Sequence, residues 1–427
     1  MSRKGIHGLF FRLIILAGAV QFTSGIGNPA SSPDAAIINC TGNVVDNVKG
    51  RVQDHDPALV WNGKNFGMVW VTDGDKLMFA SLGAGGKRVS GPRLLYDAHG
   101  SGYGYAVEYP DIVWTGSSYL IVYSDSYNGR TYFSLQVSAS GTVMKGPVNL
   151  KTEPSWTYEW AGSLAWNGSE AGFVYVNQDT NLYFKRLSKT GALIGKQVLI
   201  ASNAGRRQFG RYFAKIAWNG KEFGVAWITQ NGSAIHHQAV SAAGALVGSR
   251  ASCAKTSGAF VYLFLCPGKK GSYAFGMAFS EYLINVRTVV YFTQIARTGK
   301  LLHKAVNVRD VPLASNYVGD WPQVAWNPTK GVFHLSWQDN RVEPGSDPGI
   351  TSYYNFFVRS VKTNGTFGSA EAMLKITFKE KGYYNYECGS AFGGGRLCIG
   401  FIRALSQNIT DPDQRHYRAH SVSVSPL

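Results

Sequence analysis

The chain has 427 residues, with 42 lysines and arginines against 26 aspartates and glutamates, and a formal net charge of +16. Only 16% of its residues are charged, 13% are aromatic and 50 residues are glycine, whereas an ordinary soluble domain is about 25% charged. The apolar and aromatic content excludes a disordered chain, and the abundant glycine and tyrosine exclude a coiled coil or helical bundle. The positive charge suits a nucleic-acid partner only if the cations and a binding motif coincide.

The N-terminal segment has the features of an export signal. Arg3 and Lys4 precede an apolar stretch from Leu9 to Val20, and small residues follow at 23–25. This arrangement predicts a secretory signal peptide over residues 1–25, with an uncleaved interfacial anchor as the alternative. The stretch is too short for a transmembrane helix, and we predict no transmembrane segment elsewhere. We therefore expect a secreted protein, either extracellular or periplasmic.

The five cysteines fit an oxidising compartment. Cys253 lies close in sequence to Cys266, and Cys388 lies close to Cys398. The spacings predict two local disulfides. Cys40 is left over, and its pairing stays open.

A repeated strand–turn–strand segment organises the chain. The four clearest copies read PALVWNGKNFGMVW at 57–70, PDIVWTGSSYLIVY at 110–123, GSLAWNGSEAGFVY at 162–175 and AKIAWNGKEFGVAW at 214–227. Trp326 takes the place of the first tryptophan in a later copy with a longer turn. Alternating apolar residues predict strands, and Asn-Gly between two of them predicts a hairpin. We interpret the repeated tryptophan as packing between repeats rather than as a ligand-stacking residue.

Each copy continues with a third strand, such as 182–188, and then with a glycine turn and a short fourth strand. Two degenerate copies, at 261–279 and 387–401, keep this order without the tryptophan. A repeat of this length with four short strands is typical of a propeller blade. The sequence therefore predicts an all-β chain with one seven-bladed β-propeller of four-stranded antiparallel blades over residues 26–427. The blades are expected to start near residues 57, 110, 162, 214, 261, 322 and 387.

The last repeat lacks a fourth strand. Its third strand falls near 416–425, while the strand-like segment 35–45 has no blade of its own. We predict that segment 35–45 adds the missing outer strand to the last blade and closes the ring, which removes exposed strand edges.

These repeats resemble the secreted bacterial β-propellers built from W-(N/D)-G-x-x-(F/Y)-x-V-x-W blades. Glycine turns such as Lys189-Thr190-Gly191 are similar to those of that group, and Trp337-Gln338-Asp339-Asn340-Arg341 resembles its W-x-D-x-R turn. The resemblance covers nearly all of the chain after the predicted signal peptide and implies the propeller fold. It implies no particular activity, because propellers carry unrelated functions.

Strand order sorts the charges into two faces. The turns between first and second strands, and between third and fourth strands, share one face, which we call the bottom face; the other loops form the top face. Bottom-face turns contain only two acids, Glu170 and Glu222. The cations there are Lys64, Lys87, Arg88, Lys145, Lys189, Lys196, Lys221, Arg250, Lys269, Lys270, Arg297, Lys300, Lys304, Lys330 and Lys362. This face is predicted to bind anionic cell-surface polymers; export and the lack of a nucleic-acid motif argue against nucleic acid.

The top face combines carboxylates with aromatic side chains and an arginine. Carboxylates accept hydrogen bonds from sugar hydroxyls, and flat rings stack on sugar faces. The competing interpretation is that Asp and Pro at these positions cap turns and fix the start of each blade. The candidate ligand-binding residues are Asp56, Glu108, Tyr109, Glu159, Trp160, Arg211, Tyr212, Asp320, Trp321, Tyr386 and Glu387.

We therefore favour a carbohydrate-recognising propeller whose ligand binds at the top-face mouth of the central channel. The first alternative is an extracellular enzyme that cleaves polysaccharide. A lyase with a base such as His55 or Tyr109 and a cation such as Arg211 is preferred to a hydrolase, which needs two opposed carboxylates. A protein-interaction scaffold is a further alternative. We expect no cofactor; calcium at Asp73-Gly74-Asp75, or a cation at Asp54-His55-Asp56, competes with simple turns.

Overall fold

The computed structural model describes most of the chain after residue 35. The described residues are 36–46, 54–98, 106–126, 130–153, 162–204, 214–283, 288–310, 318–341, 355–377, 384–404 and 417–425. The predicted signal peptide over residues 1–25 lies outside them. The regular elements of the described part are all β-strands, and this part contains no helix of the length and apolarity that a membrane span needs.

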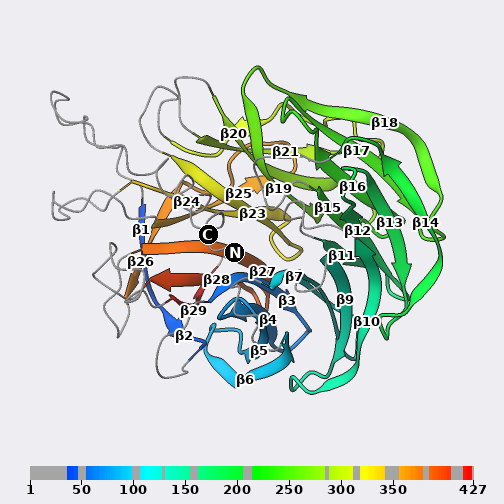
Figure 1. Cartoon of the computed structure of the whole chain (residues 1–427). Coiled ribbons are helices and arrows are strands. Elements are labelled where there is room, and N and C mark those ends of the chain that lie inside the picture. The colour runs from blue at the N-terminus through cyan, green and yellow to red at the C-terminus, as the bar shows by residue number, and fades with distance from the viewer. Residues whose placement is uncertain are drawn as a thin grey trace, which may run out of the picture. The chain divides into compact units, whose positions relative to one another are not determined.

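Seven sheets form the blades of a propeller, numbered I to VII in chain order (Figure 1). Blade I contains β3 (His55–Trp61), β4 (Phe66–Thr72), β5 (Lys76–Leu82) and β6 (Arg88–Asp97). Blade II contains β7 (Val107–Trp114), β8 (Tyr119–Asp125), β9 (Arg130–Val137) and β10 (Val143–Glu153). Blade III contains β11 (Ser163–Trp166), β12 (Ala171–Val176), β13 (Leu182–Leu187) and β14 (Leu193–Ala201). Blade IV contains β15 (Ala214–Trp218), β16 (Glu222–Ile228), β17 (Ala234–Ser241) and β18 (Leu246–Lys255).

The remaining blades follow the same order. Blade V contains β19 (Ala259–Pro267), β20 (Phe275–Tyr282), β21 (Thr288–Ile295) and β22 (Val306–Asn307). Blade VI contains β23 (Gly319–Asn327), β24 (Val332–Asp339), β25 (Asn355–Lys362) and β26 (Ala372–Thr377). Blade VII contains β27 (Tyr384–Gly393), β28 (Arg396–Ala404) and β29 (Tyr417–Val424).

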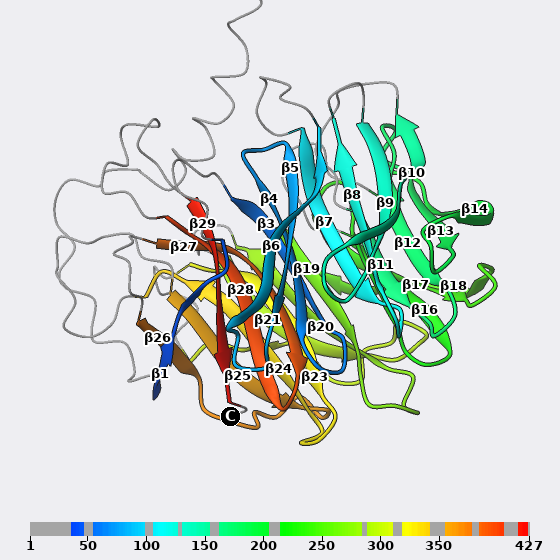
Figure 2. The ribbon, with the colours of Figure 1, turned by 90° about the horizontal axis from the view of Figure 1, so that it is seen from below.

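The first strand of each blade lies at the centre of the ring. Each first strand contacts the first strand of the next blade, in the order β3, β7, β11, β15, β19, β23, β27 and back to β3. Within a blade, the later strands follow outward in sequence (Figure 2). This arrangement confirms the predicted seven-bladed propeller of antiparallel blades.

The N-terminal segment contributes to two blades rather than one. β2 (Asn43–Val44) pairs antiparallel with β29 and completes the fourth strand of blade VII, as predicted. β1 (Ala36–Thr41) instead pairs parallel with β26 and becomes a fifth strand of blade VI. Only Gly42 separates the two strands, so one short segment joins the last two blades.

The repeated tryptophan packs within its own blade, and in blade I it also makes the contact between blades that the sequence predicted. In four blades it packs against an aromatic residue at the first or second position of the second strand, with nearly constant geometry. The ring centroids are separated by 4.7 Å for Trp61–Phe66, 4.8 Å for Trp114–Tyr119, 4.7 Å for Trp218–Phe223 and 4.7 Å for Trp326–Phe333. Trp61 also lies against blade VII so closely that a Cβ added to Gly393 would fall 2.1 Å from its Cγ atom.

A glycine in the second strand makes room for the next blade. A Cβ at Gly224 would lie 2.4 Å from the Phe275 ring of blade V, and a Cβ at Gly276 would lie 2.4 Å from the Phe333 ring of blade VI. Non-bonded carbon atoms do not approach this closely in proteins, so both positions require glycine. The F-G pair of the repeat therefore supplies both the ring and the space for the next ring.

The predicted disulfides are absent, because none of the five cysteines is disulfide-bonded. Cys388 packs in the cluster shared with blade VI, whereas Cys398 packs on the opposite face of the sheet in the cluster shared with blade I. Cys253 lies on the outer strand β18 of blade IV, and Cys266 lies on the inner strand β19 of blade V. The disulfide prediction from closeness in sequence was therefore wrong. Cys388 and Cys398 lie on opposite faces of one sheet, and Cys253 and Cys266 lie in different blades.

Candidate functional site

Three of the inner strands share an unusual backbone conformation near their top-face ends. Asp56, Tyr109 and Trp321 have φ values of 52°, 51° and 50°. Each directly precedes a proline, and each lies where the register between the first two strands is interrupted. A left-handed conformation is uncommon for bulky residues and costs about 1–3 kcal/mol. Its recurrence in three blades shows that a bulge before a proline is a shared feature of the inner strands of blades I, II and VI.

In blade I this conformation serves the blade interface. Asp56 is buried, its Oδ2 atom accepts a hydrogen bond of 3.2 Å from the backbone N–H of Tyr109 in blade II, and the same oxygen lies 3.0 Å from His55 Nδ1. The carboxylate therefore links blades I and II.

The two candidates of blade II are also buried. Glu108 forms an ion pair with Arg130 at 3.3 Å, and its backbone carbonyl accepts a hydrogen bond of 3.2 Å from Ser124 Oγ. Tyr109 is only 2% exposed. Both side chains are thus packed within the protein, so a ligand at the top face could contact only their backbone atoms.

Blade VI presents a more accessible arrangement. Trp321 stacks on Tyr262 of blade V with ring centroids 4.6 Å apart and an angle of 30° between the planes, and both side chains are partly exposed. Asp320 Oδ1 accepts hydrogen bonds from Trp321 N–H at 2.9 Å and from Ser280 Oγ at 3.1 Å. Burial raises the pKa of Asp320 to about 7, although both hydrogen bonds favour the charged form. An aromatic pair and a carboxyl group therefore meet at this part of the mouth.

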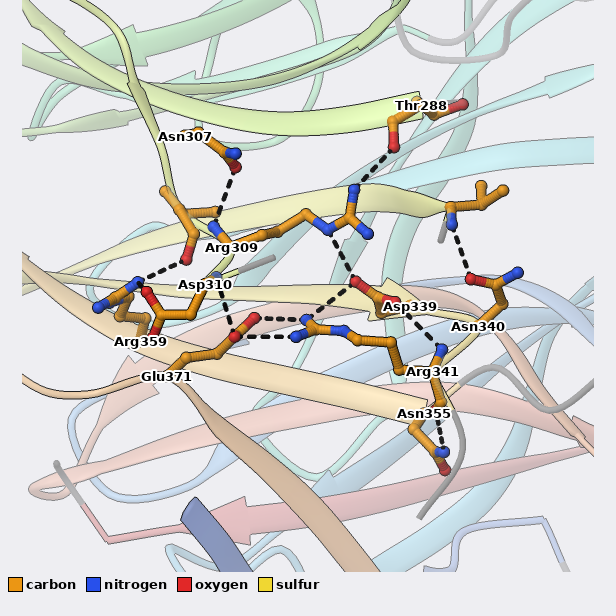
Figure 3. Close-up of polar contacts among 12 residues, drawn as sticks. Thr288, Asn307, Arg309, Asp310, Asp339, Asn340, Arg341, Asn355, Arg359 and Glu371 are labelled. Carbon is orange, nitrogen blue, oxygen red and sulfur yellow. Dashed lines mark hydrogen bonds and ion pairs between the residues drawn. The ribbon is translucent and has the colours of Figure 1, made fainter. Parts of the chain in front are cut away.

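A buried ion-pair network supports this part of blade VI (Figure 3). Asp339, which pairs with Gly319 next to Asp320, accepts from Arg309 Nε at 2.9 Å and from Arg341 Nη2 at 3.0 Å. Arg341 also binds Glu371 through both terminal nitrogens, and its guanidinium lies 3.9 Å from the centre of the Phe357 ring. Removing one member would leave a buried charge uncompensated, so the network fixes the end of β24 beside Asp320.

A second set of polar residues lies three positions before the repeated tryptophan. Lys215 Nζ lies 5.2 Å from the centre of the Phe264 ring; burial lowers the pKa of Lys215, while the charge of Asp111 acts in the opposite direction. Asp111 itself accepts hydrogen bonds of 2.9 Å from the N–H groups of Leu164 and Ile112. Lys215 and Phe264 were not among the residues predicted from the sequence. The repeats do carry a signal for Lys215, because the first copy has alanine, Ala58, at the equivalent position.

The candidate cation sites have other partners. Lys76 Nζ lies 3.1 Å from Asp75 Oδ1 and 3.6 Å from Asp73 Oδ2, which supplies positive charge at that turn. Asp54 Oδ2 accepts a hydrogen bond of 2.6 Å from the N–H of Ala419, and burial raises its pKa. Among the residues that the structure describes, no group of three or more His, Cys, Asp or Glu side chains is arranged to hold a metal ion.

The side chains of the six remaining candidates are not among those that the structure describes. Glu159, Trp160, Arg211 and Tyr212 lie outside the described residues, and Tyr386 and Glu387 are described only as part of strand β27.

Comparison with solved structures bears on the fold. The chain is similar to the BP39L lectin from Burkholderia pseudomallei, at 11% identity over 88% of this chain and 98% of that chain, with a TM-score of 0.54. It is less similar to the β-propeller domain of the Trilobed protease from Pyrococcus furiosus, at 8% identity over 87% and 96% of the chains, with a TM-score of 0.47. The α-L-arabinanase from Penicillium chrysogenum has 10% identity over 92% and 99%, with a TM-score of 0.45. No family model and no curated protein matches the sequence.

Proposed function

We propose that this protein is a secreted carbohydrate-recognising propeller of the repeat group that its blades resemble, with the sugar bound at the top-face channel mouth. The observation that carries the proposal is the stacked Tyr262–Trp321 pair beside Asp320, where partly exposed rings and a carboxyl group meet. The lectin with the similar fold shows that a propeller can serve this purpose, but fold alone does not assign function.

The chemistry of the site suits a neutral or weakly acidic sugar. A flat ring offers its face to the C–H groups of a pyranose, and the second ring behind it holds that face in place. Asp320 accepts hydrogen bonds when ionised and donates one when protonated, and its pKa of about 7 makes both forms accessible near neutral pH. Because Asp56 and Glu108 are committed to other protein groups, the ligand is expected to lie on the blade V–VI side of the mouth.

Glycan-array binding followed by titration of the best sugar tests the proposal. Trp321→Ala is expected to weaken binding by about tenfold, equivalent to about 1.4 kcal/mol, while Trp321→Phe keeps most of the affinity. Tyr282→Ala is the matched control, because Tyr282 is an exposed aromatic residue at the end of β20 that makes no ring contact with Trp321 or Tyr262 among the described residues. Its affinity should equal that of the unaltered protein.

Two results would overturn the proposal. The first is the absence of binding to every sugar on the array. The second is sugar binding that Trp321→Ala and Tyr282→Ala leave equally unchanged, which would locate the ligand elsewhere. Pull-down of a protein partner, with no sugar binding, would favour the scaffold alternative.

Polysaccharide cleavage is the second candidate, and the raised pKa of Asp320 is the observation that favours it. A carboxyl group with a pKa of about 7 is suited to donate or accept a proton near neutral pH. Incubation with uronate polymers should then give an unsaturated product that absorbs in the ultraviolet, and Asp320→Asn should abolish it. Sugar binding without any product, by contrast, would support recognition alone.

A further inference from the structure

The bottom face contains a turn that is repeated with the same geometry in six blades. In each case a glycine at the fourth position has φ between 78° and 91°. Its N–H donates to the residue three positions earlier, as from Gly86 to Gly83 at 2.8 Å and from Gly365 to Lys362 at 3.0 Å. The six glycines are Gly86, Gly141, Gly191, Gly244, Gly299 and Gly365. Equal turn geometry places the two or three residues that follow each glycine at the bottom rim of its blade.

Each of these turns presents an exposed apolar side chain within three residues of its glycine. Exposure ranges from 38% for Phe367 to 63% for Val89. The six residues are Val89, Met144, Leu193, Leu246, Leu302 and Phe367. Single exposed apolar residues are ordinary on a protein surface, but one in each of six consecutive blades at one rim is a pattern.

The same turns carry lysine or arginine and no acid. No carboxylate occurs in the six described segments 83–93, 138–148, 188–199, 241–252, 296–307 and 362–370. Their exposed cations without an ion-pair partner among the described residues include Lys87, Lys145, Lys196, Arg250, Lys300 and Lys362.

The two acids of the bottom face are already neutralised. Glu170 binds Arg186 through both oxygens, at 2.7 and 2.8 Å. Glu222 is buried and accepts from Arg297 Nη1 at 2.6 Å. The face therefore offers uncompensated positive charge around a rim of apolar side chains.

We infer that the bottom face docks on a lipid bilayer that carries anionic headgroups. Lysines near such a surface gain electrostatic attraction, and apolar side chains beside them enter the boundary between headgroups and acyl chains. A soluble anionic polysaccharide would use the lysines but would gain little from six exposed apolar residues. The inference develops the anionic partner that the sequence predicts for this face, and it is independent of sugar recognition at the top face.

Sedimentation with vesicles tests the inference on the full chain. Vesicles of phosphatidylglycerol and phosphatidylcholine are compared with phosphatidylcholine alone, and binding is expected only to the anionic vesicles and to weaken with added salt. The combined variant Lys145→Gln, Lys196→Gln and Lys300→Gln should lower partitioning about a hundredfold, from about fivefold for each lysine. Because every variant keeps residues 1–25, attachment through that segment would be common to all.

The apolar rim is tested separately, since it distinguishes lipid from polymer. Met144→Ser, Leu246→Ser and Leu302→Ser together should lower vesicle binding about tenfold. Leu94→Ser with Leu199→Ser is the matched control, because these residues are 52% and 45% exposed on outer strands β6 and β14 but lie toward the top face. Thermal unfolding of each variant checks that the fold is kept.

The inference fails if anionic vesicles are not bound, or if the apolar rim variant binds them as well as the control does. Binding of soluble polygalacturonate that is lost in the lysine variant, without vesicle binding, would assign the face to anionic polymer instead. A failed glycan array would leave this experiment unaffected, so the two proposals can be judged apart.

Discussion

The glycine of the second strand provides a quantitative test of how the blades pack. In Gly224→Ala, the new Cβ would lie 2.4, 2.6 and 2.8 Å from three atoms of the Phe275 ring. Phe275 is fully buried, so the ring cannot turn away into solvent. Overpacking of this kind costs about 1–3 kcal/mol, and three contacts to a rigid ring place the expected loss at the upper end, about 3 kcal/mol.

Urea unfolding followed by intrinsic fluorescence measures this loss best. Unfolding entropy of about 2 cal/mol/K per residue means that a chain of this size loses only about 1 °C in Tm per kcal/mol. We therefore expect a Tm lowered by about 3 °C, together with a clear fall in the urea midpoint. Gly85→Ala is the control: a Cβ there meets nothing within 4 Å, so its stability should stay within about 0.5 kcal/mol.

A double variant separates the ring contact from a general effect of alanine in a strand. Phe275→Leu alone removes buried surface and destabilises the protein. Combined with Gly224→Ala, it should destabilise by less than the sum of the two single changes, because the smaller side chain relieves the overlap. Strict additivity, or a Gly224→Ala protein as stable as Gly85→Ala, would refute the packing argument.

Two further predictions concern buried charge. Burial lowers the pKa values of His237, His334 and His420 to about 4. Between pH 6.5 and 4 the unfolded chain therefore binds protons that the folded chain does not. The free energy of unfolding should fall over this range by up to about 3 kcal/mol for each histidine. Asp320, with its pKa raised to about 7, acts oppositely and favours the folded state as pH falls through the same range. Urea midpoints measured across this range should decline with acid, and His237→Phe should reduce the slope, whereas an unchanged slope would contradict it. Glu371→Gln should lower the free energy of unfolding by about 3–5 kcal/mol, because it removes the ion-pair partner of buried Arg341. A urea midpoint close to that of the unaltered protein would show that the network is not stabilising.

Much of the fold could be predicted from the sequence because each blade repeats the same local pattern. The tryptophan followed by a turn and an aromatic residue specifies a hairpin whose rings must meet, as Trp218 and Phe223 do at 4.7 Å. Partner choice between blades is less local. The strand edge that receives β1 is a property of the assembled ring. The sequence therefore predicted the pairing of segment 35–45 with blade VII, which β2 makes, and missed the pairing of β1 with blade VI.

The site was harder to predict for a related reason. Asp56, Glu108 and Asp320 look alike in the sequence, because each is an acid at the start of a blade. In the structure Asp56 links blades I and II, and Glu108 pairs with Arg130. Asp320 instead binds Ser280 and lies beside stacked rings. Their partners come from other blades or later strands, which no local pattern reveals. The proline after each bulged residue was visible in the sequence, and it marks the positions where the backbone is strained.

The N-terminal strands also determine when the ring can be completed. Asp54 accepts a hydrogen bond from Ala419, 365 residues later in the chain, and β2 pairs with β29 near the C-terminus. Contacts this distant in sequence form slowly, because a long loop must close before they become favourable. The N-terminal strand β2 must therefore wait until β29 has been synthesised before it can pair. Ring closure thus follows synthesis of the whole propeller, and a chain truncated before residue 417 would leave β2 and β28 without the strand that joins them.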